Sequence, residues 1–426
     1  MTAAALALLL AAAAPAQDTL RLPALQEAAL RRDPRARQLA LQKEAARLRL
    51  RSVAVQRLPQ LGVGGTASHQ SEVPALPVSL PGVEVPEPPK DRWEATLDVT
   101  QRLYDGGELR RRAEVEEAQL AVERAELDAA LHPLRAEVAE AFFTAFLLGE
   151  RLGETALLAE DLEARLALLR AQHRAGAALP GDTAALRAEL LRVGQERDEL
   201  AAGRRAALDV LGRLAGRPVG EADVLALPDL SAEVERARAE EEALRAHPLH
   251  AVFAARRERL AREAALVGAR ERPQLSAWGQ LGYGRPGLRQ FTDDPHEYWT
   301  VGVRLRWTPW DWGTGGRERA LLRVRGETVD TEEAAFAEQL ARQVRDELAA
   351  IDRLRAALET DERIIALRGQ VERQARAQLA ERAITPAAYV AVRADLQEAR
   401  LARQRHRVEL ERARAGYLTT LGVAPR

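Results

Sequence analysis

The sequence repeats itself at long range, and this duplication limits the possible folds more than any other feature of the 426 residues. The tripeptide Pro-Gln-Leu at 59–61 returns at 273–275, an offset of 214 positions. Further along the chain Tyr104 matches Trp310, an offset of 206. The change in offset falls between Leu61 and Trp93, as expected for an insertion in a surface loop. We therefore predict two tandem copies of one structural unit, each of about two hundred residues and far longer than a solenoid repeat.

The two predicted copies have the same order of elements. The first copy covers residues 17–212, with strands 58–71 and 93–102, a loop over 72–92 between them, and long helices over 108–212. The second copy covers 233–426, with strands 273–284 and 299–308, a loop over 285–298, and long helices over 317–421. Residues 213–232, which contain glycine and proline, are predicted to link the copies.

A heptad pattern runs through the longest predicted helix. Small and apolar residues follow 4,3 spacing from Leu127 to Leu169, which predicts left-handed supercoiling against neighbouring helices. A continuous helix is predicted from Glu108 to His173, and Pro133 is expected to bend it. Aromatic residues make up only 4% of the chain, while alanine, leucine, arginine and glutamate dominate. This composition is typical of coiled coils rather than of one large globular core.

The predicted strands alternate between apolar and polar side chains. The apolar set, expected to face lipid and to end in aromatic girdles, comprises Trp93, Trp299, Val301, Val303, Leu305 and Trp307. The polar set, expected to face a lumen, comprises Glu94, Thr96, Asp98, Thr100, Arg304 and Arg306. Trp278 breaks the alternation in its strand. The alternative interpretation is an ordinary antiparallel sheet packed on a helix.

The N-terminus resembles a secretion signal. Residues 2–14 are an uncharged, alanine- and leucine-rich run, and Ala14-Pro15-Ala16 has the small-x-small pattern of a cleavage site. We predict a signal peptide over residues 1–16; the alternative is a buried alanine-rich helix. No later stretch is apolar enough to predict a transmembrane helix.

Charge and cysteine content exclude several classes of function. Lysine plus arginine number 63 and aspartate plus glutamate 64, so no basic excess favours binding to nucleic acid. The absence of cysteine excludes disulfides, thiolate metal sites and cysteine nucleophiles.

Two other motifs do not support chemistry. The run at 62–67 mimics a dinucleotide-binding G-x-G-x-x-A, but it runs into proline-rich sequence instead of a helix. His247 and His250 could bind a metal, but no third ligand lies nearby in the sequence, so a helix-start residue and a surface histidine are the favoured interpretation. We therefore predict no catalytic residues, no cofactor and no metal, and a protein that is not an enzyme.

Each predicted strand-to-helix junction carries a short aromatic-Asp motif. The eight junction residues are Tyr104, Asp105, Gly106, Gly107, Trp310, Asp311, Trp312 and Gly313. Glycine supplies the backbone freedom for a change of direction, and aspartate can cap the helix that follows. The paired motifs resemble the signatures of the TolC-like outer-membrane efflux protein family, or outer membrane factors, and the resemblance extends over the whole mature chain.

The resemblance implies an α+β membrane protein that works as a homotrimer. Four strands per chain would contribute to a trimeric 12-stranded transmembrane β-barrel, and the long helices would form a coiled-coil barrel across the periplasm. The implied function is the passive exit duct of a tripartite efflux pump or type I secretion system. The implied partners are a periplasmic adaptor (membrane fusion) protein, an inner-membrane transporter and outer-membrane lipid, with no nucleic acid. The alternative function is a soluble periplasmic coiled-coil adaptor or scaffold.

Two helix turns resemble the family's periplasmic tip, which docks the adaptor. The positions matched to the tip are Gly176, Ala177, Leu179 and Asp182 in the first copy, and Arg382, Ile384 and Thr385 in the second. Arg382 stands where the family pattern has glycine, so the second turn departs from that pattern.

Overall fold

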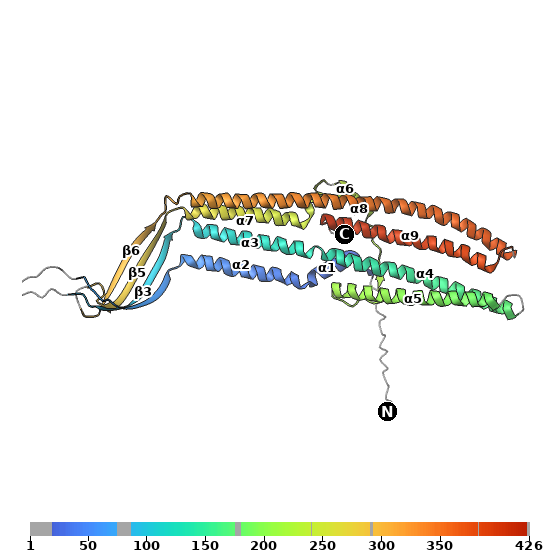
Figure 1. Ribbon diagram of the computed structural model, residues 1–426, viewed down its shortest axis with the longest axis horizontal. Helices are drawn as coiled ribbons and strands as arrows, with labels where there is room; N and C mark the ends of the chain where they lie inside the picture. Colours follow the sequence, from blue (N-terminus) through green and yellow to red (C-terminus); the bar gives the residue numbers. More distant parts are fainter. Residues whose placement is uncertain are drawn as a thin grey trace, which may run out of the picture. The chain divides into compact units, whose positions relative to one another are not determined.

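The computed structural model describes residues 19–74, 87–174, 180–239, 241–289, 293–381 and 383–423 (Figure 1). The predicted signal peptide, residues 1–16, lies outside these ranges. The chain divides into two compact units. The helical unit contains the described parts of Met1–Arg37, Leu127–His250 and Ala335–Arg426, and the strand unit contains those of Gln38–Glu126 and Ala251–Ala334.

Helices dominate both halves of the chain. In each half a pair of strands follows a helix and is followed in turn by long helices. The first half has α1 (Leu22–Arg32), α2 (Gln38–Ala54), β2 (Gln60–His69), β3 (Asp91–Tyr104), α3 (Glu108–Leu131), α4 (Leu134–Arg174) and α5 (Pro180–Ala215). The second has α6 (Ser231–Ala239), α7 (Pro248–Arg270), β5 (Gln274–Arg285), β6 (His296–Arg306), α8 (Thr314–Ala380) and α9 (Pro386–Leu421). Two short strands, β1 (Thr19–Leu20) and β4 (Val224–Leu225), pair in parallel.

The observed boundaries differ from the predicted ones at several ends. The predicted strand 58–71 is shorter, at Gln60–His69, and 93–102 is longer, at Asp91–Tyr104. The predicted strand 273–284 is shifted by one residue to Gln274–Arg285. The predicted strand 299–308 is shifted to His296–Arg306, so Trp307 lies beyond its end. Proline at 309 explains the early end, because it cannot continue the hydrogen-bonded ladder.

The predicted continuous helix from Glu108 to His173 is interrupted. α3 ends at Leu131 and α4 begins at Leu134, with His132 and Pro133 between them. Proline lacks the amide that the helix needs and its ring crowds the preceding turn. Gln339 occupies the matching position in the second half, and α8 runs through it without a break.

The strand unit is built around one antiparallel sheet of order β2-β3-β5-β6 (Figure 1). Its register aligns Val63 with Leu97, Leu97 with Leu281, and Leu281 with Trp299. Directly paired residues share a face of an antiparallel sheet, so these four side chains form one row. A register shift between Arg102 and Tyr104 interrupts the pairing of β3 with β5 close to the following helix.

The helical unit has an apolar core where α1, α4, α5 and α9 meet. Leu22, Phe142, Leu211 and Leu418 are all fully buried there. Burial of each of these side chains contributes about 2 kcal/mol. Gln26 is also buried, and its Nε2 donates to the carbonyl oxygen of Arg135 over 2.9 Å, which joins α1 to α4.

Beyond this core α4 and α5 continue as an antiparallel hairpin (Figure 1). Its interior is a second apolar cluster, made of Ala159, Leu162, Leu166, Leu186 and Val193. Within the described ranges no helix has an apolar stretch sufficient to cross a membrane.

Candidate functional site: the sheet, its junctions and the helical hairpins

The sheet exposes one apolar face. Val63, Trp299 and Val303 retain 86%, 71% and 65% of their accessible surface, so no described part of the chain covers them. Along β6 the exposed set continues with Val301 and Leu305. A contiguous apolar face of this kind marks a surface that contacts lipid or another protein. These exposures do not fit the alternative of a sheet packed on a helix of the same chain.

The aromatic residues of this face lie towards both ends of the sheet. Trp93, near the loop end, packs edge to face against Tyr283, with ring centroids 5.6 Å apart. At the other end Trp307 lies past β6 and is 55% exposed. Trp310 and Trp312 follow it, with ring centroids 5.9 Å apart, and both are exposed. The aromatic side chains at this junction end therefore come mainly from the connection into α8 and not from the strand.

The opposite face of the sheet is polar. Glu94 accepts a hydrogen bond of 2.9 Å from the Tyr298 hydroxyl. Asp98 accepts bonds from Gln280 at 2.9 Å and from the Thr96 hydroxyl at 3.0 Å. Thr100, Arg304 and Arg306 belong to the same face by strand alternation. All six residues predicted for a lumen therefore lie on one face, opposite the apolar set.

Two glycines give large rings room on the polar face. A side-chain carbon on Gly302 would lie 3.0 Å from the Trp278 ring, and one on Gly282 would lie 2.2 Å from Tyr298. Trp278 pairs with Gly302 and Tyr298 pairs with Gly282 across β5 and β6. Trp278 therefore does not disturb the alternation: it belongs to the polar face and lies over a glycine.

The two strand-to-helix junctions share one hydrogen-bonding geometry. The Asp105 carboxylate accepts from the amides of Gly107 and Leu109, each at 2.9 Å. The Asp311 carboxylate accepts from Gly313 at 2.8 Å and from Gly315 at 2.7 Å. In both cases the acceptor bonds the amides two and four positions ahead, which satisfies free donors at the start of α3 and α8.

The residue after each aspartate has left-handed backbone. Gly106 has φ 65°, and Trp312 at the matching position has φ 57°. A side-chain carbon on Gly106 would also lie 2.7 Å from Arg272, so glycine is needed there. Tryptophan pays an energetic penalty for this conformation, and such strain concentrates at functional positions.

The junction hydrogen bonds change the acidity of both carboxyl groups. Burial is the largest single influence on Asp105 and raises its pKa, but the amides of Leu109 and Gly107 outweigh it and hold the pKa below the usual value. The amides of Gly315 and Gly313 lower the pKa of Asp311. Both groups are therefore anionic near neutral pH, as acceptors of amide hydrogen bonds should be.

The predicted tip is described only in part. Gly176, Ala177, Leu179 and Arg382 lie outside the described residues, as does the side chain of Asp182. In the second turn Thr385 caps α9, because its hydroxyl accepts from the Ala388 amide over 3.2 Å. Ile384, just before it, is partly exposed.

A polar network around the buried pair Tyr389 and Glu372, close to Thr385, was not predicted from the sequence. The Tyr389 hydroxyl on α9 donates to Oε1 of Glu372 on α8 over 2.6 Å, and Arg376 donates to the same oxygen over 2.7 Å. The hydroxyl of Tyr389, followed by the guanidinium of Arg376, lowers the pKa of Glu372. The guanidinium of Arg165 on α4 lies over the Tyr389 ring at 4.9 Å.

Asp161 completes this network from α4. Its two carboxylate oxygens accept from Arg165 and from Arg393 of α9, each over 2.7 Å. The network therefore joins three helices that come from both halves of the sequence. The sequence signals are local to each helix: Asp161 and Arg165, Glu372 and Arg376, and Tyr389 and Arg393 are each spaced i, i+4, which puts the two members of a pair on one helix face.

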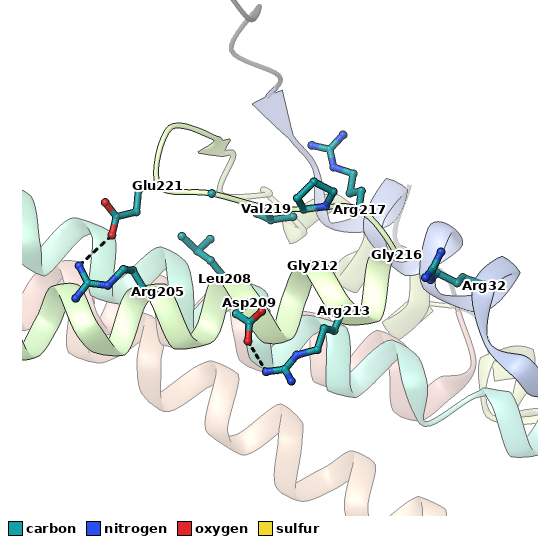
Figure 2. Close-up of a pocket in the computed structure, with 12 residues that line it drawn as sticks. Arg32, Arg205, Leu208, Asp209, Gly212, Arg213, Gly216, Arg217, Val219 and Glu221 are labelled. Carbon is teal, nitrogen blue, oxygen red and sulfur yellow. Dashed lines mark hydrogen bonds and ion pairs between the residues drawn. The ribbon is translucent and has the colours of Figure 1, made fainter.

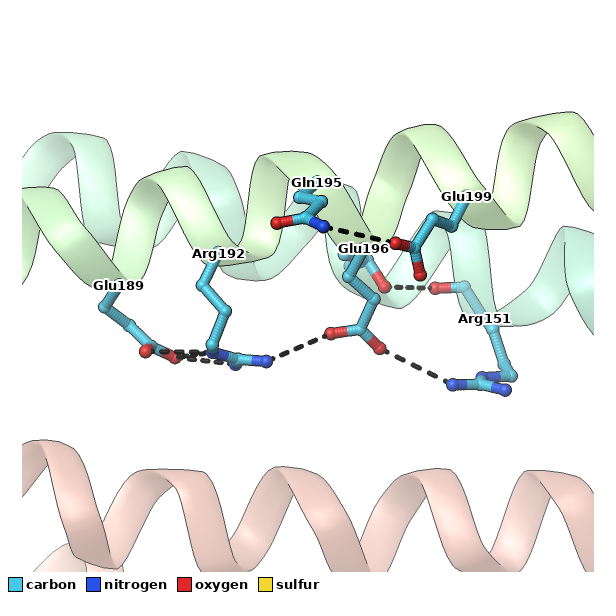
Figure 3. Close-up of polar contacts among 7 residues, drawn as sticks. Arg151, Glu189, Arg192, Gln195, Glu196 and Glu199 are labelled. Atoms are coloured by element: carbon cyan, nitrogen blue, oxygen red, sulfur yellow. Dashed lines mark hydrogen bonds and ion pairs between the residues drawn. The ribbon is translucent and has the colours of Figure 1, made fainter.

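A line of alternating charges runs along the α4–α5 hairpin (Figure 3). Arg192 bonds Glu189 at 2.7 Å and Glu196 at 3.4 Å, and Glu196 lies 3.5 Å from Arg151 on α4. Exposed pairs of this kind add well under 1 kcal/mol each. We interpret this line as a solvated helix face and not as a binding site.

A hollow of about 550 Å³ lies beside the C-terminal end of α5 (Figure 2). Most of its charges pair with each other: Arg205 lies 3.4 Å from Glu221, and Arg213 pairs with Asp209. Arginines at a helix C-terminus also favour the helix dipole. These contacts explain the charged lining as part of the fold.

His247 and His250, the two histidines considered as metal ligands, both lie against the ring of Phe336. His247 lies 5.0 Å from His132 and 4.9 Å from Phe336 between ring centroids. Burial first, and then the neighbouring histidines, lower the pKa of His247 to about 4. Nδ1 of His247 accepts from the Leu249 amide over 3.2 Å. Among the described residues no group of three ligands has metal-binding geometry.

Comparisons with known proteins agree with this arrangement. Residues 25–217 match the sequence profile of the family described as outer membrane efflux protein. A search of curated protein sequences found no match.

Solved structures of similar fold cover almost the whole chain. CusC shares 16% identity with a TM-score of 0.70, and the alignment covers 94% of this chain and 92% of CusC. VceC, an outer membrane protein of Vibrio cholerae, shares 16% identity with a TM-score of 0.64 over 95% and 96% of the two chains. MtrE, an outer membrane channel of Neisseria gonorrhoeae, shares 19% identity with a TM-score of 0.65 over 95% and 89%. Residues 25–217 therefore match the outer membrane efflux protein family in sequence, and the chain shares its fold with the solved outer-membrane proteins named above.

Proposed function

We propose that this chain forms the outer-membrane exit duct of a tripartite efflux pump or type I secretion system. The observation that carries the proposal is the two-faced sheet. One face presents uncovered apolar side chains such as Val303. The other face presents polar and charged side chains, together with glycines over which the rings of Trp278 and Tyr298 lie. A sheet with lipid on one side and water on the other requires this division.

The proposal requires three copies of the chain. Four strands cannot close a barrel, because the smallest membrane barrels need about eight. β2 and β6 are the two edge strands of the sheet, and unpaired backbone groups in a membrane carry a severe energetic penalty. Pairing of β6 in one copy with β2 in the next would remove both edges and give a 12-stranded barrel.

In this proposal the helices form a periplasmic tube. The α4–α5 and α8–α9 hairpins would extend the passage, and their ends would dock a periplasmic adaptor protein that also contacts an inner-membrane transporter. The network of Tyr389, Glu372 and Arg165 lies near one of these ends and would hold neighbouring helices together. In this proposal transport through this chain is passive and is driven by the transporter.

The test is whether the protein assembles and conducts in membranes. The full chain should be found in the outer-membrane fraction, should be extracted only by detergent as a trimer that dissociates on heating, and should conduct ions in planar bilayers. Mature protein recovered wholly from the soluble periplasmic fraction would instead support the alternative of a periplasmic coiled-coil adaptor or scaffold.

A further inference from the structure

The positive charges of the polar sheet face gather at its junction end. Arg102 pairs in register with Ser276, and Ser276 pairs with Arg304, so both arginines lie in one row across three strands. Arg306 pairs with Gln274, one step nearer to α8. Adjacent strands are about 4.8 Å apart, which places Arg102 and Arg304 roughly 10 Å from each other across the face.

These three guanidinium groups are not neutralised by neighbours. All three side chains are exposed, and none forms an ion pair with a residue that the structure describes. The Arg304 guanidinium lies 5.7 Å from the Trp278 ring centroid. An aromatic face orients a guanidinium without cancelling its charge.

The carboxylates nearest in sequence to this row are engaged elsewhere. Asp105 and Asp311 accept backbone amides at the two helix starts. Glu108 lies 3.7 Å from both Arg112 and Arg270, and accepts a hydrogen bond from Gln274. Asp105 and Asp311 keep their negative charge while they accept these amide hydrogen bonds, but among the described residues none of the three carboxylates forms an ion pair with an arginine of the row.

The acidic groups of the polar face lie towards its other end. Asp98 is four residues before Arg102 along β3, a separation of about 13 Å at the usual rise of a strand. That separation exceeds the Debye length of about 8 Å at physiological ionic strength. Asp98 and Glu94 share their end of the face with Arg92, which reduces the negative charge there. The face is therefore distinctly positive at the junction end and only weakly negative at the loop end.

We infer that Arg102, Arg304 and Arg306 form an anion-selective ring at the junction end of the sheet. This inference rests on the proposed function, since three copies are needed to close the ring. Each copy supplies three arginines, so a trimer places nine around the opening through which cargo leaves the helical tube. The ring would attract and briefly hold cargo that carries carboxylate, sulfate or phosphate groups, because guanidinium groups bind such oxyanions in bidentate geometry.

Ion selectivity in planar bilayers tests the ring. The full chain is reconstituted under a KCl gradient, and the reversal potential gives the permeability ratio of chloride to potassium. We expect chloride to be preferred. The triple variant Arg102→Gln, Arg304→Gln, Arg306→Gln should lower the ratio several-fold, and Lys at the same three positions should preserve it because the charge remains.

Matched variants separate this effect from a general loss of structure. Glu94→Gln with Asp98→Asn should raise the ratio, because it removes negative charge from the other end of the same face. Each single Arg→Gln variant should shift the ratio by part of the triple effect, which keeps the test valid if the triple variant does not assemble.

Inorganic sulfate distinguishes a binding ring from simple attraction. If the arginines hold oxyanions, sulfate should reduce the chloride current of the unmodified protein more than that of the Gln variants. A protein that conducts but prefers potassium, or whose ratio ignores the arginine substitutions, would overturn the ring and leave the duct intact. A protein that never conducts would overturn the proposed duct itself.

Discussion

The Tyr389 hydroxyl donates to Oε1 of Glu372 over 2.6 Å, and both side chains are buried between helices. Replacement of Tyr389 by Phe removes this bond and leaves a buried carboxylate with Arg376 as its only partner on the described helices. Loss of one buried partner of a charged group is expected to destabilise by about 1–3 kcal/mol. Thermal unfolding and hydrogen exchange over α9 should both report the loss.

The control for Tyr389→Phe is an exposed pair on the same two helices. Arg368 on α8 bonds Asp395 on α9 over 2.6 Å, but both side chains are nearly half exposed. Arg368→Gln should change the unfolding temperature little, since exposed pairs contribute weakly. Equal effects of Arg368→Gln and Tyr389→Phe would show that burial of the network does not matter.

Asp105→Ala should weaken the start of α3 by about 1 kcal/mol, because two amides lose their acceptor. The pKa of Asp105 is lowered in the folded state, so its stabilisation is present above the unfolded pKa and is lost as pH falls through the folded pKa. The stability difference between Asp105→Ala and the unmodified protein should therefore shrink in acid. Chemical unfolding at a series of pH values measures it, with a difference independent of pH as the contrary result.

Trp312→Gly separates backbone strain from aromatic contact. Glycine adopts the left-handed conformation freely, so this change should relieve about 1 kcal/mol of strain. Trp312→Ala also removes the contact with Trp310 but keeps a side-chain carbon at φ 57°. Denaturant titrations should find the Gly variant more stable than the Ala variant; the reverse order would contradict backbone strain at position 312.

His247→Asn should reduce the sensitivity of the protein to mild acid. The pKa of His247 is about 4 in the fold and 6.5 in its absence, so the unfolded chain takes up a proton first as pH falls. Stability is therefore lost between about pH 6.5 and pH 4, and none is lost above that range. Asn can still accept from the Leu249 amide but does not titrate in this range.

The relevant quantity for His247→Asn is the drop in unfolding temperature from pH 7 to pH 4.5, which should be smaller in the variant. His250 and His132 remain in both proteins, so their contributions largely cancel in the comparison. An identical drop would assign the acid response to other groups.

Val303→Arg tests which face of the sheet meets lipid. A charge on a lipid-facing strand near mid-membrane is expected to cost about 2–4 kcal/mol, and recovery of assembled protein from membranes should fall. Arg304→Ser, one residue along on the polar face, should leave assembly unchanged. Equal recovery of both variants would contradict the assignment of the faces.

The sequence predicted local features better than long-range contacts. Alternation along β6 and the aspartate-glycine motifs depend on neighbouring residues, so the strands and helix starts could be located to within a few positions. The strand ends were less certain, because Tyr298 and Trp307 suit a strand equally well and only Pro309 limits the ladder. The sequence predicts a bend at Pro133, whereas the helix is interrupted there, because a single proline does not reveal whether a helix bends or breaks.

The network around Tyr389 could not have been predicted in the same way. Glu372 and Tyr389 are separated by a helix turn, and Arg165 comes from the other half of the sequence. Their contact depends on how three helices pack, which no local period describes. Trp278 was misplaced for a related reason: its role depends on Gly302 on the next strand and not on its own neighbours.

The two glycines beneath the rings of Trp278 and Tyr298 have a consequence for the calibre of the proposed passage. Each ring lies against its strand only because the opposite residue has no side chain. A single methyl group at 282 or 302 would lift a ring away from the wall, and threefold symmetry would repeat that change around the bore. The width available to a passing molecule would thus depend on Gly282 and Gly302, because their lack of a side chain lets the two rings lie flat against the wall.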